Sequence, residues 1–129
     1  MRKHLLLLFL SLGVPGMAEA KSLAVTGVAG YLSEWELNGT VTETTSDQNE
    51  FSGSLSMKHV GLCSVNGPEV KAANIKFQIT TLRASRSNIS ATVTIDGAPC
   101  TFSGPLSESY SGRLDCPNAK GVPLQLLVK

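Results

Sequence analysis

The chain has 129 residues, of which 42% are hydrophobic and 16% are charged, with a formal net charge of +1 at pH 7. This length allows one ordinary domain, and so low a charged fraction excludes a chain kept disordered by excess charge. A nearly neutral chain has no overall field to steer it onto nucleic acid or an anionic membrane, so neither partner is expected.

Residues 1–20 have the pattern of a secretory signal peptide. A basic start precedes an apolar stretch, and Ala-Glu-Ala at residues 18–20 presents small side chains at the two positions that a signal peptidase reads. The apolar stretch, residues 5–14, is about half of the roughly 20 residues that a membrane-spanning helix needs. We therefore expect cleavage after Ala20, a secreted or periplasmic bacterial protein, and a single β domain over residues 21–129 with no transmembrane segment.

Charges are balanced but segregated in the expected mature chain. Of the 11 basic and 10 acidic residues, two and one fall in the first twenty, which leaves nine of each. Acidic residues alone occur between Lys21 and Lys58, and basic residues alone between Glu69 and Asp96. The pattern indicates either two solvated surfaces or one polarised binding face.

Alternation of apolar and polar residues predicts β-strands along the chain. The predicted strands cover residues 31–41, 51–58, 75–80, 89–96, 99–106, 110–116 and 122–128. Leu32 breaks the alternation of the first of them. Asp96-Gly97 is a strong signal for a two-residue hairpin turn, and Pro123 indicates that the last strand lies at an edge or opens there.

Two hairpin registers can be tested against each other. With Asp96-Gly97 as the turn, Val93 faces Cys100 on the apolar side of the hairpin. A three-residue loop over residues 107–109 then places Cys100 opposite Cys116. Both registers point the same set of residues inward, which supports each of them.

A repeat accompanies these strands. Phe-Ser-Gly-Ser-Leu-Ser at residues 51–56 recurs as Phe-Ser-Gly-Pro-Leu-Ser at 102–107, and Gly-Thr-Val-Thr at 39–42 recurs as Ala-Thr-Val-Thr at 91–94. The nearly constant offset predicts a duplicated four-strand unit, with repeats over residues 31–82 and 88–129. About eight antiparallel strands would close as a small β-barrel or fold over as a β-sandwich, and alternation alone does not choose between these all-β folds.

Three cysteines would enter an oxidising compartment, so one disulfide is expected. The hairpin register favours Cys100 with Cys116, because both lie on one face and opposite each other. Cys63 would then be a free, buried thiol. The rival pairing joins Cys63 with Cys116, which hold equivalent positions in the repeats.

The sequence contains few residues in patterns typical of catalytic or metal-binding sites. His59 is the one histidine of the expected mature chain, and its spacing from Cys63 does not bring the two together on a strand. Glu34 and Glu36 share the polar face of a predicted strand and are expected to be solvated carboxylates. No phosphate loop, dinucleotide fingerprint or zinc-ligand series occurs in the sequence, so we predict no catalytic residue, metal or cofactor.

Two irregular stretches and a basic segment are the candidate binding loops. One stretch is the acidic loop over residues 43–50, the second runs from residue 59 to residue 70, and the basic segment follows the strand predicted at 75–80. The candidate binding residues are Glu43, Asp47, Glu50, His59, Asn66, Arg83 and Arg86.

The sequence favours a non-enzymatic binding protein of the bacterial envelope, a monomer that binds an unidentified protein or small ligand. In size and strand pattern, with Trp35 in Glu-Trp-Glu-Leu-Asn-Gly at residues 34–39, it resembles small exported bacterial β proteins, including calycin-like barrels and periplasmic enzyme inhibitors. That resemblance implies two alternatives, a carrier of a small apolar ligand or an enzyme inhibitor, and carries over no residues. An enzyme with an unusual carboxylate or His59 site is the third class.

Overall fold

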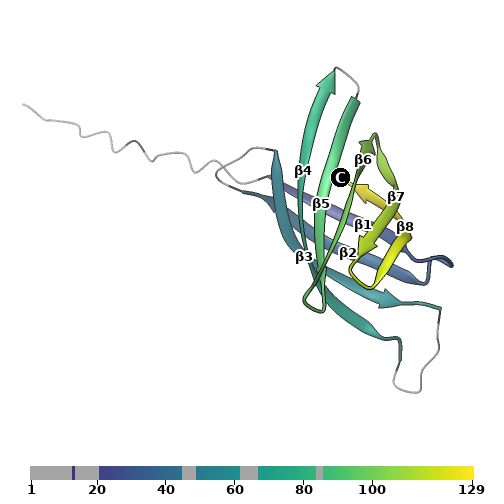
Figure 1. The fold of residues 1–129 in the computed structure, drawn as a ribbon. Coiled ribbons are helices and arrows are strands. Elements are labelled where there is room, and N and C mark those ends of the chain that lie inside the picture. Colours follow the sequence, from purple (N-terminus) through teal and green to yellow (C-terminus); the bar gives the residue numbers. More distant parts are fainter. Residues whose placement is uncertain (1–12, 14–20, 45–48, 62–66, 84–85) are drawn as a thin grey trace, which may run out of the picture.

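The protein is described here from a computed structural model, which places residue 13 and residues 21–44, 49–61, 67–83 and 86–129. Eight strands form one closed antiparallel barrel in which each strand pairs with its neighbours along the chain and β1 pairs with β8 (Figure 1). The strands are β1 (Ser22–Ala29), β2 (Trp35–Glu43), β3 (Glu50–His59), β4 (Val70–Arg83), β5 (Arg86–Ile95), β6 (Ala98–Leu106), β7 (Ser109–Cys116) and β8 (Ala119–Val128). The predicted all-β fold is confirmed as a barrel rather than a sandwich. No helix of the described residues is long and apolar enough to cross a membrane.

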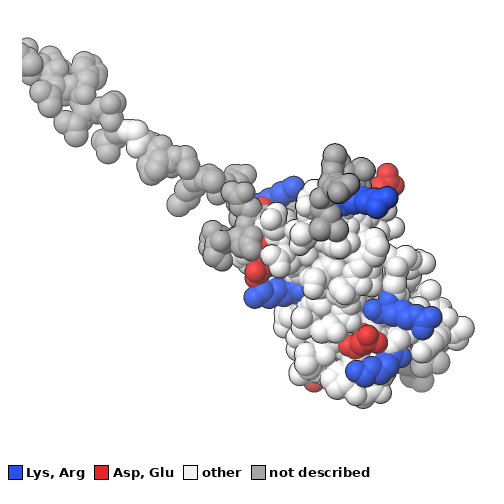
Figure 2. All heavy atoms as spheres, turned by 45° about the horizontal axis from the view of Figure 1, so that its top comes forward, with Lys and Arg blue, Asp and Glu red and all other residues white. Residues whose placement is uncertain are grey.

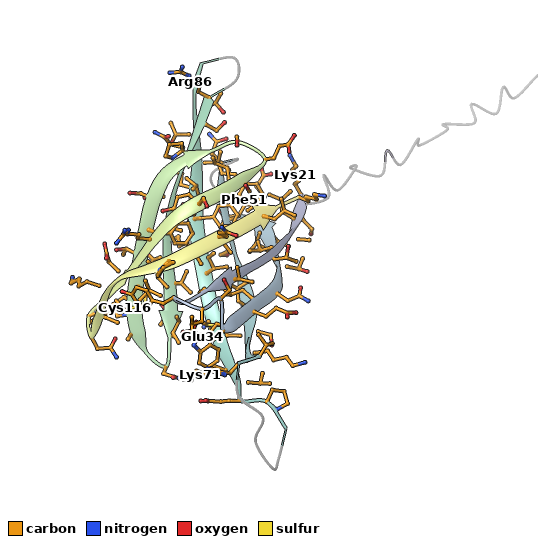
Figure 3. All side chains as sticks on the ribbon, turned by 90° about the vertical axis from the view of Figure 1, so that its right-hand side faces the viewer. Lys21, Glu34, Phe51, Lys71, Arg86 and Cys116 are labelled. Atoms are coloured by element: carbon orange, nitrogen blue, oxygen red, sulfur yellow. A yellow bond between two sulfur atoms is a disulfide. The ribbon has the colours of Figure 1, made fainter. Side chains whose placement is uncertain are left out.

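The barrel has two ends, which we name for what lies there. At the Trp35 end β1, β3, β5 and β7 finish, and at the terminal end β1 begins and β8 finishes. In Figure 3 the labels Glu34, Lys71 and Cys116 lie toward the Trp35 end, and Lys21 and Arg86 lie toward the terminal end.

The barrel interior is filled by alternate residues of every strand. Phe51 and Phe77 stack with ring centroids 5.3 Å apart, and Phe102 lies 4.8 Å from the ring of Tyr110. Smaller aliphatic side chains from every strand except β6 complete the same buried cluster. The buried residues are Val25, Ala29, Leu37, Val41, Phe51, Leu55, Met57, Ala73, Ile75, Phe77, Ile89, Ala91, Val93, Cys100, Phe102, Tyr110, Leu114, Leu124 and Leu126.

Two inward glycines let β2 and β3 approach closely. A Cβ atom at Gly39 would collide with the carbonyl oxygen of Ser54, and one at Gly53 would collide with that of Thr40. These residues interlock, because Thr40 lies opposite Ser54 in the β2–β3 register. Glycine in a strand interior marks such close approaches and the sharp bends that close a small barrel.

The β5–β6 hairpin has the predicted turn and register. Asp96 and Gly97 both have positive φ, 51° and 80°, as a type I′ turn requires. Val93 lies opposite Cys100, as expected from that turn.

Of the eight strand pairings, the one between β6 and β7 has the shortest hydrogen-bonded register, and we call this pairing the seam. Its registered pair is Thr101 with Asp115, in the register predicted from the sequence. Beside that pair the predicted Cys100–Cys116 disulfide is confirmed, with a Cα–Cα distance of 4.2 Å. An open groove of about 470 Å³ runs along β5, β6 and β7. The disulfide therefore adds a covalent link where the hydrogen-bond ladder between β6 and β7 is sparse.

Other expectations need correction. The strand β1 was not predicted, because its inward positions include Gly27 and Ala29 and give a weak apolar signal. Tyr31 does not begin a strand, since β2 starts at Trp35. Pro123 is not at a sheet edge: the barrel is closed, and the β1–β8 ladder starts one residue later, while the Pro123 carbonyl accepts a hydrogen bond from Gly30.

The predicted duplication of a four-strand unit stays a prediction. The matching segments at 39–42 and 91–94 fall on β2 and β5, three strands apart rather than four. The expected first repeat, residues 31–82, contains β2, β3 and nearly all of β4, whereas residues 88–129 contain most of β5 and all of the last three strands.

Candidate interaction surface

Large apolar side chains are exposed around the Trp35 end. Tyr31 and Leu32 precede β2 and are 73% and 88% exposed, and Val60 and Val70, which flank the β3–β4 connection, are 49% and 62% exposed. Single exposed apolar residues are ordinary, but all four large ones found among the described residues gather at one end of the barrel. This grouping makes the Trp35 end the candidate site.

The β1–β2 turn, residues 30–34, has its own hydrogen bonds. The Ser33 amide donates to the Gly30 carbonyl at 3.1 Å, and the Leu32 amide donates to Oε2 of Glu34 at 2.9 Å. Gly30 has φ of 102°, and Ser33 has φ of 51°, a value that only a small share of non-glycine residues adopt. The side chain of Glu34 thus folds back over the turn and accepts a hydrogen bond from its backbone.

The carboxylate of Glu34 is stabilised in its charged form. Its pKa lies below the ordinary value because the backbone amides of Glu34 itself and of Leu32 donate to it, and nearby His59 adds a smaller lowering effect. These effects exceed the opposing effect of partial desolvation. Glu34 therefore stays ionised near neutral pH, and its hydrogen bond to the turn is present there.

Backbone contacts also fix the turn to its neighbours. The Val60 amide donates to the Glu34 carbonyl at 2.7 Å, and the Gly30 amide donates to the Pro123 carbonyl at 2.9 Å. The turn is thereby attached both to the chain that leaves β3 and to β8.

Inward side chains close the barrel mouth behind these residues. The rings of Trp35 and His59 meet edge to face with centroids 4.7 Å apart, and Lys71 Nζ lies 5.3 Å from the Trp35 centroid. Lys71 also pairs with Asp96 at 3.3 Å and Glu69 at 3.9 Å. This group covers the buried core and connects β2, β3 and β4 at the mouth.

His59 belongs to that mouth, where its ring meets Trp35. Its Nδ1 atom is buried and has no hydrogen-bond partner in the part of the chain that the structure describes. Within the same residues, no group of three or more His, Cys, Asp or Glu side chains has an arrangement that could hold a metal ion.

The predicted binding residues are divided between the two ends. Glu43 ends β2 and Glu50 begins β3, and Arg83 lies opposite Arg86 where β4 meets β5, so these four lie at the terminal end. His59 lies at the Trp35 end. Asp47 and Asn66 lie outside the described residues, as does Cys63, so the expectations for them stay predictions.

The segregation of charge along the sequence does not persist in space. Glu50 pairs with Lys76 of the adjacent strand at 3.0 Å, and Lys71 pairs with two carboxylates. Figure 2 shows basic and acidic side chains interspersed on the face that it presents. Of the two carboxylates expected on one strand face, Glu34 instead belongs to the β1–β2 turn, while Glu36 is exposed on β2.

Sequence reasoning missed the four exposed apolar residues. The one available signal was Leu32, whose position broke the alternation of the predicted strand. In a strand, one of two adjacent residues faces the core, but in this turn both Tyr31 and Leu32 face solvent. The break in alternation at Leu32 therefore coincides with the exposed tip of the turn.

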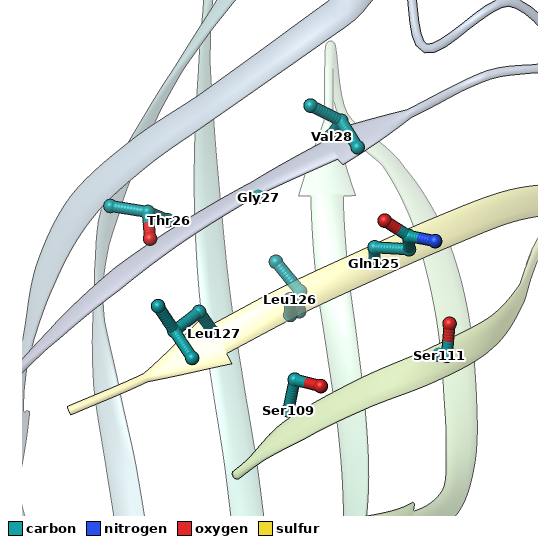
Figure 4. Close-up of a pocket in the computed structure, with 8 residues that line it drawn as sticks. All are labelled: Thr26, Gly27, Val28, Ser109, Ser111, Gln125, Leu126 and Leu127. Carbon is teal, nitrogen blue, oxygen red and sulfur yellow. The ribbon is translucent and has the colours of Figure 1, made fainter.

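The outer wall offers a shallower feature. A pocket of about 430 Å³ crosses β1, β7 and β8 on the outside of the barrel (Figure 4). Small outward side chains such as Ser109 and Ser111 leave it open, and Val28 and Leu127 add apolar surface. No charged side chain lines it, so it offers no ion-pair partner to a charged ligand.

Searches against known protein families, curated proteins and solved structures find no match for this chain.

Proposed function

We propose that the chain is a non-enzymatic binding protein of the bacterial envelope, secreted or periplasmic, that recognises another protein through the Trp35 end. The observation that carries the proposal is the grouping of Tyr31, Leu32, Val60 and Val70 at that end. The core of a protein interface is more apolar than the rest of the surface and is enriched in aromatic residues, and Tyr31 is of that kind.

The filled interior supports an interaction protein over a carrier of an apolar ligand. Carriers of this size hold their ligand inside the barrel. Here Phe51, Phe77, Phe102 and Tyr110 occupy the interior, and the mouth at one end is covered by Trp35. An inhibitor of an envelope enzyme is one kind of protein-binding function that the same surface would serve.

Comparison of two matched variants tests the proposal. The full chain is immobilised and exposed to a bacterial envelope extract, as wild type, as the Leu32→Asp, Val70→Asp double variant and as the Arg86→Glu variant. We expect a specific protein to be retained by the wild type and by Arg86→Glu, which changes the terminal end, but not by the double variant.

Equal retention by all three proteins, or no specific retention, would contradict the proposed site. A catalytic turnover that disappears on His59→Ala would contradict the non-enzymatic assignment. Detection of chains that begin at Lys21 in the envelope fraction supports export, whereas uncleaved chains confined to the cytoplasm contradict it.

A further inference from the structure

The β1–β2 turn is fixed by several hydrogen bonds although its tip is exposed. Hydrogen bonds hold it within itself, to Glu34, to the backbone beyond β3 and to β8. The carboxylate of Glu34 also lies directly over Gly30, where a Cβ atom would collide with it. A turn ordered in the free protein loses little conformational entropy on binding, which favours affinity.

The exposed tip of this turn is apolar and projects from the barrel wall. Tyr31 and Leu32 have most of their side-chain surface in solvent, whereas Gly30 behind them is buried. A convex apolar tip on a fixed base is complementary to a concave apolar pocket, and burial of such side chains in a pocket is typical of interface hot spots.

The base of the turn is acidic. Residues 30–36 contain Glu34 and Glu36 and no basic residue. Glu36 lies opposite Lys58 on β3, but Glu34 has no ion-pair partner among the described residues and is held by backbone amides. A partner that covers the tip must meet this carboxylate, so basic groups beside its pocket would complement it.

We propose that the β1–β2 turn is a preorganised prong that inserts Tyr31 and Leu32 into an apolar pocket of a folded partner protein, and that basic side chains of the partner lie at the rim of that pocket. The proposal rests on the proposed function, because it names the segment and the kind of partner through which the Trp35 end binds. An anionic lipid surface is a poor match, since the carboxylate beside the tip would be repelled.

Site-specific crosslinking in the full chain identifies what contacts the tip. The photoreactive amino acid p-benzoylphenylalanine replaces Leu32 in one variant and Arg86, at the terminal end, in the control. Both are irradiated in a bacterial envelope extract, and crosslinked proteins are identified by mass spectrometry. We expect a partner that crosslinks from position 32 and not from position 86.

Affinity for that partner then tests the prong itself. We expect Leu32→Ser to weaken binding about 10- to 100-fold, the range for burial of one leucine side chain. Leu127→Ser is the matched control, because it makes the same substitution on the outer wall of β8, away from the Trp35 end, and it should change affinity less than about 3-fold. Glu34→Gln retains an oxygen acceptor for the turn but lacks the charge, so it should slow association at low salt and reduce its salt dependence.

The outcomes separate this proposal from the function on which it rests. A partner whose affinity is insensitive to Leu32→Ser, or falls equally with Leu127→Ser, contradicts the prong but leaves a protein-binding function. A crosslink from position 32 to a second copy of this chain, or binding to anionic lipid vesicles that Leu32→Ser abolishes, also contradicts the prong. Absence of any partner from both positions contradicts the prong and the proposed function together.

Discussion

Removal of the Cys100–Cys116 disulfide should destabilise the barrel at the seam between β6 and β7. The two cysteines are 16 residues apart in sequence, and the bond lies beside Thr101↔Asp115, the registered pair of that closure. In the chain-entropy model, a loop of this length contributes about 3 kcal/mol to the free energy of unfolding. That is a large share of the roughly 5 to 15 kcal/mol expected for a domain of this size.

Urea unfolding of a Cys100→Ala, Cys116→Ala variant measures this effect. We expect the free energy of unfolding to fall by about 3 kcal/mol, and the melting temperature by about 10 to 20 °C. Cys63→Ala is the control, because it removes a thiol but retains the disulfide, and it also prevents exchange among three cysteines during reduction experiments.

Hydrogen exchange shows which strands lose stability in the double cysteine variant. Because the seam has few ladder hydrogen bonds, amides of β6 and β7 should lose protection first in the double variant, while the well-paired β3 and β4 remain protected. A loss below about 1 kcal/mol, together with equal protection of all strands, would refute the reasoning that the disulfide closes the barrel.

Three further predictions concern the wall, the turn and the seam. Gly53→Ala should cost about 1 to 3 kcal/mol in urea unfolding, since its Cβ would collide with the Thr40 carbonyl, and an alanine tolerated without loss would contradict the close approach. The pKa of Glu34 is lowered in the fold, so its stabilisation of the β1–β2 turn is present above the ordinary carboxyl pKa and is lost as pH falls through the lowered value. NMR titration should show this change in the turn amides of the wild type, and its persistence in Glu34→Gln would assign it elsewhere. Tyr110→Phe should cost about 0.5 to 1.5 kcal/mol, because the hydroxyl donates to the Ser103 carbonyl across the seam at 3.3 Å, and unchanged stability would show that this bond contributes nothing.

Sequence patterns predicted the second half of the barrel well, for local reasons. Asp96-Gly97 determines both the turn type and the register of the β5–β6 hairpin, and the alternation of inward residues then places Cys100 opposite Cys116. Such relations need only the period of a strand and the length of a turn.

Closure was not predictable in the same way. Whether eight strands close or fold over depends on how sharply the sheet bends, and that bend depends on the close contacts at Gly39 and Gly53. In a pattern of alternating apolar and polar residues, these glycines count as neither, so the pattern gives no sign of the bend. The strand β1 was missed for the same reason, because Gly27 and Ala29 occupy its inward side.

The sequence and the structure point to different candidate surfaces, because the exposure of a side chain depends on its neighbours in space. The acidic loop and the basic segment drew attention to Glu50 and Arg86, which lie at the opposite end from Tyr31 and Leu32. Glu50 has a neighbouring lysine that no local pattern indicated. The shape of the β1–β2 turn depends on bonds to Val60 and to β8, which are distant in the sequence.

Because β1 pairs with β8, the barrel wall has no free edge, and the first and last strands are neighbours in it. Ala24 and Lys129 exchange two backbone hydrogen bonds, of 2.7 and 3.0 Å, so the first and last strands lie as close together as any hairpin pair. A short linker could therefore join them, and the sequence could be reopened at the β6–β7 connection without changing the order of strands around the wall. In such a circular permutant the seam would hold the new ends, and the disulfide would be the covalent link directly across it.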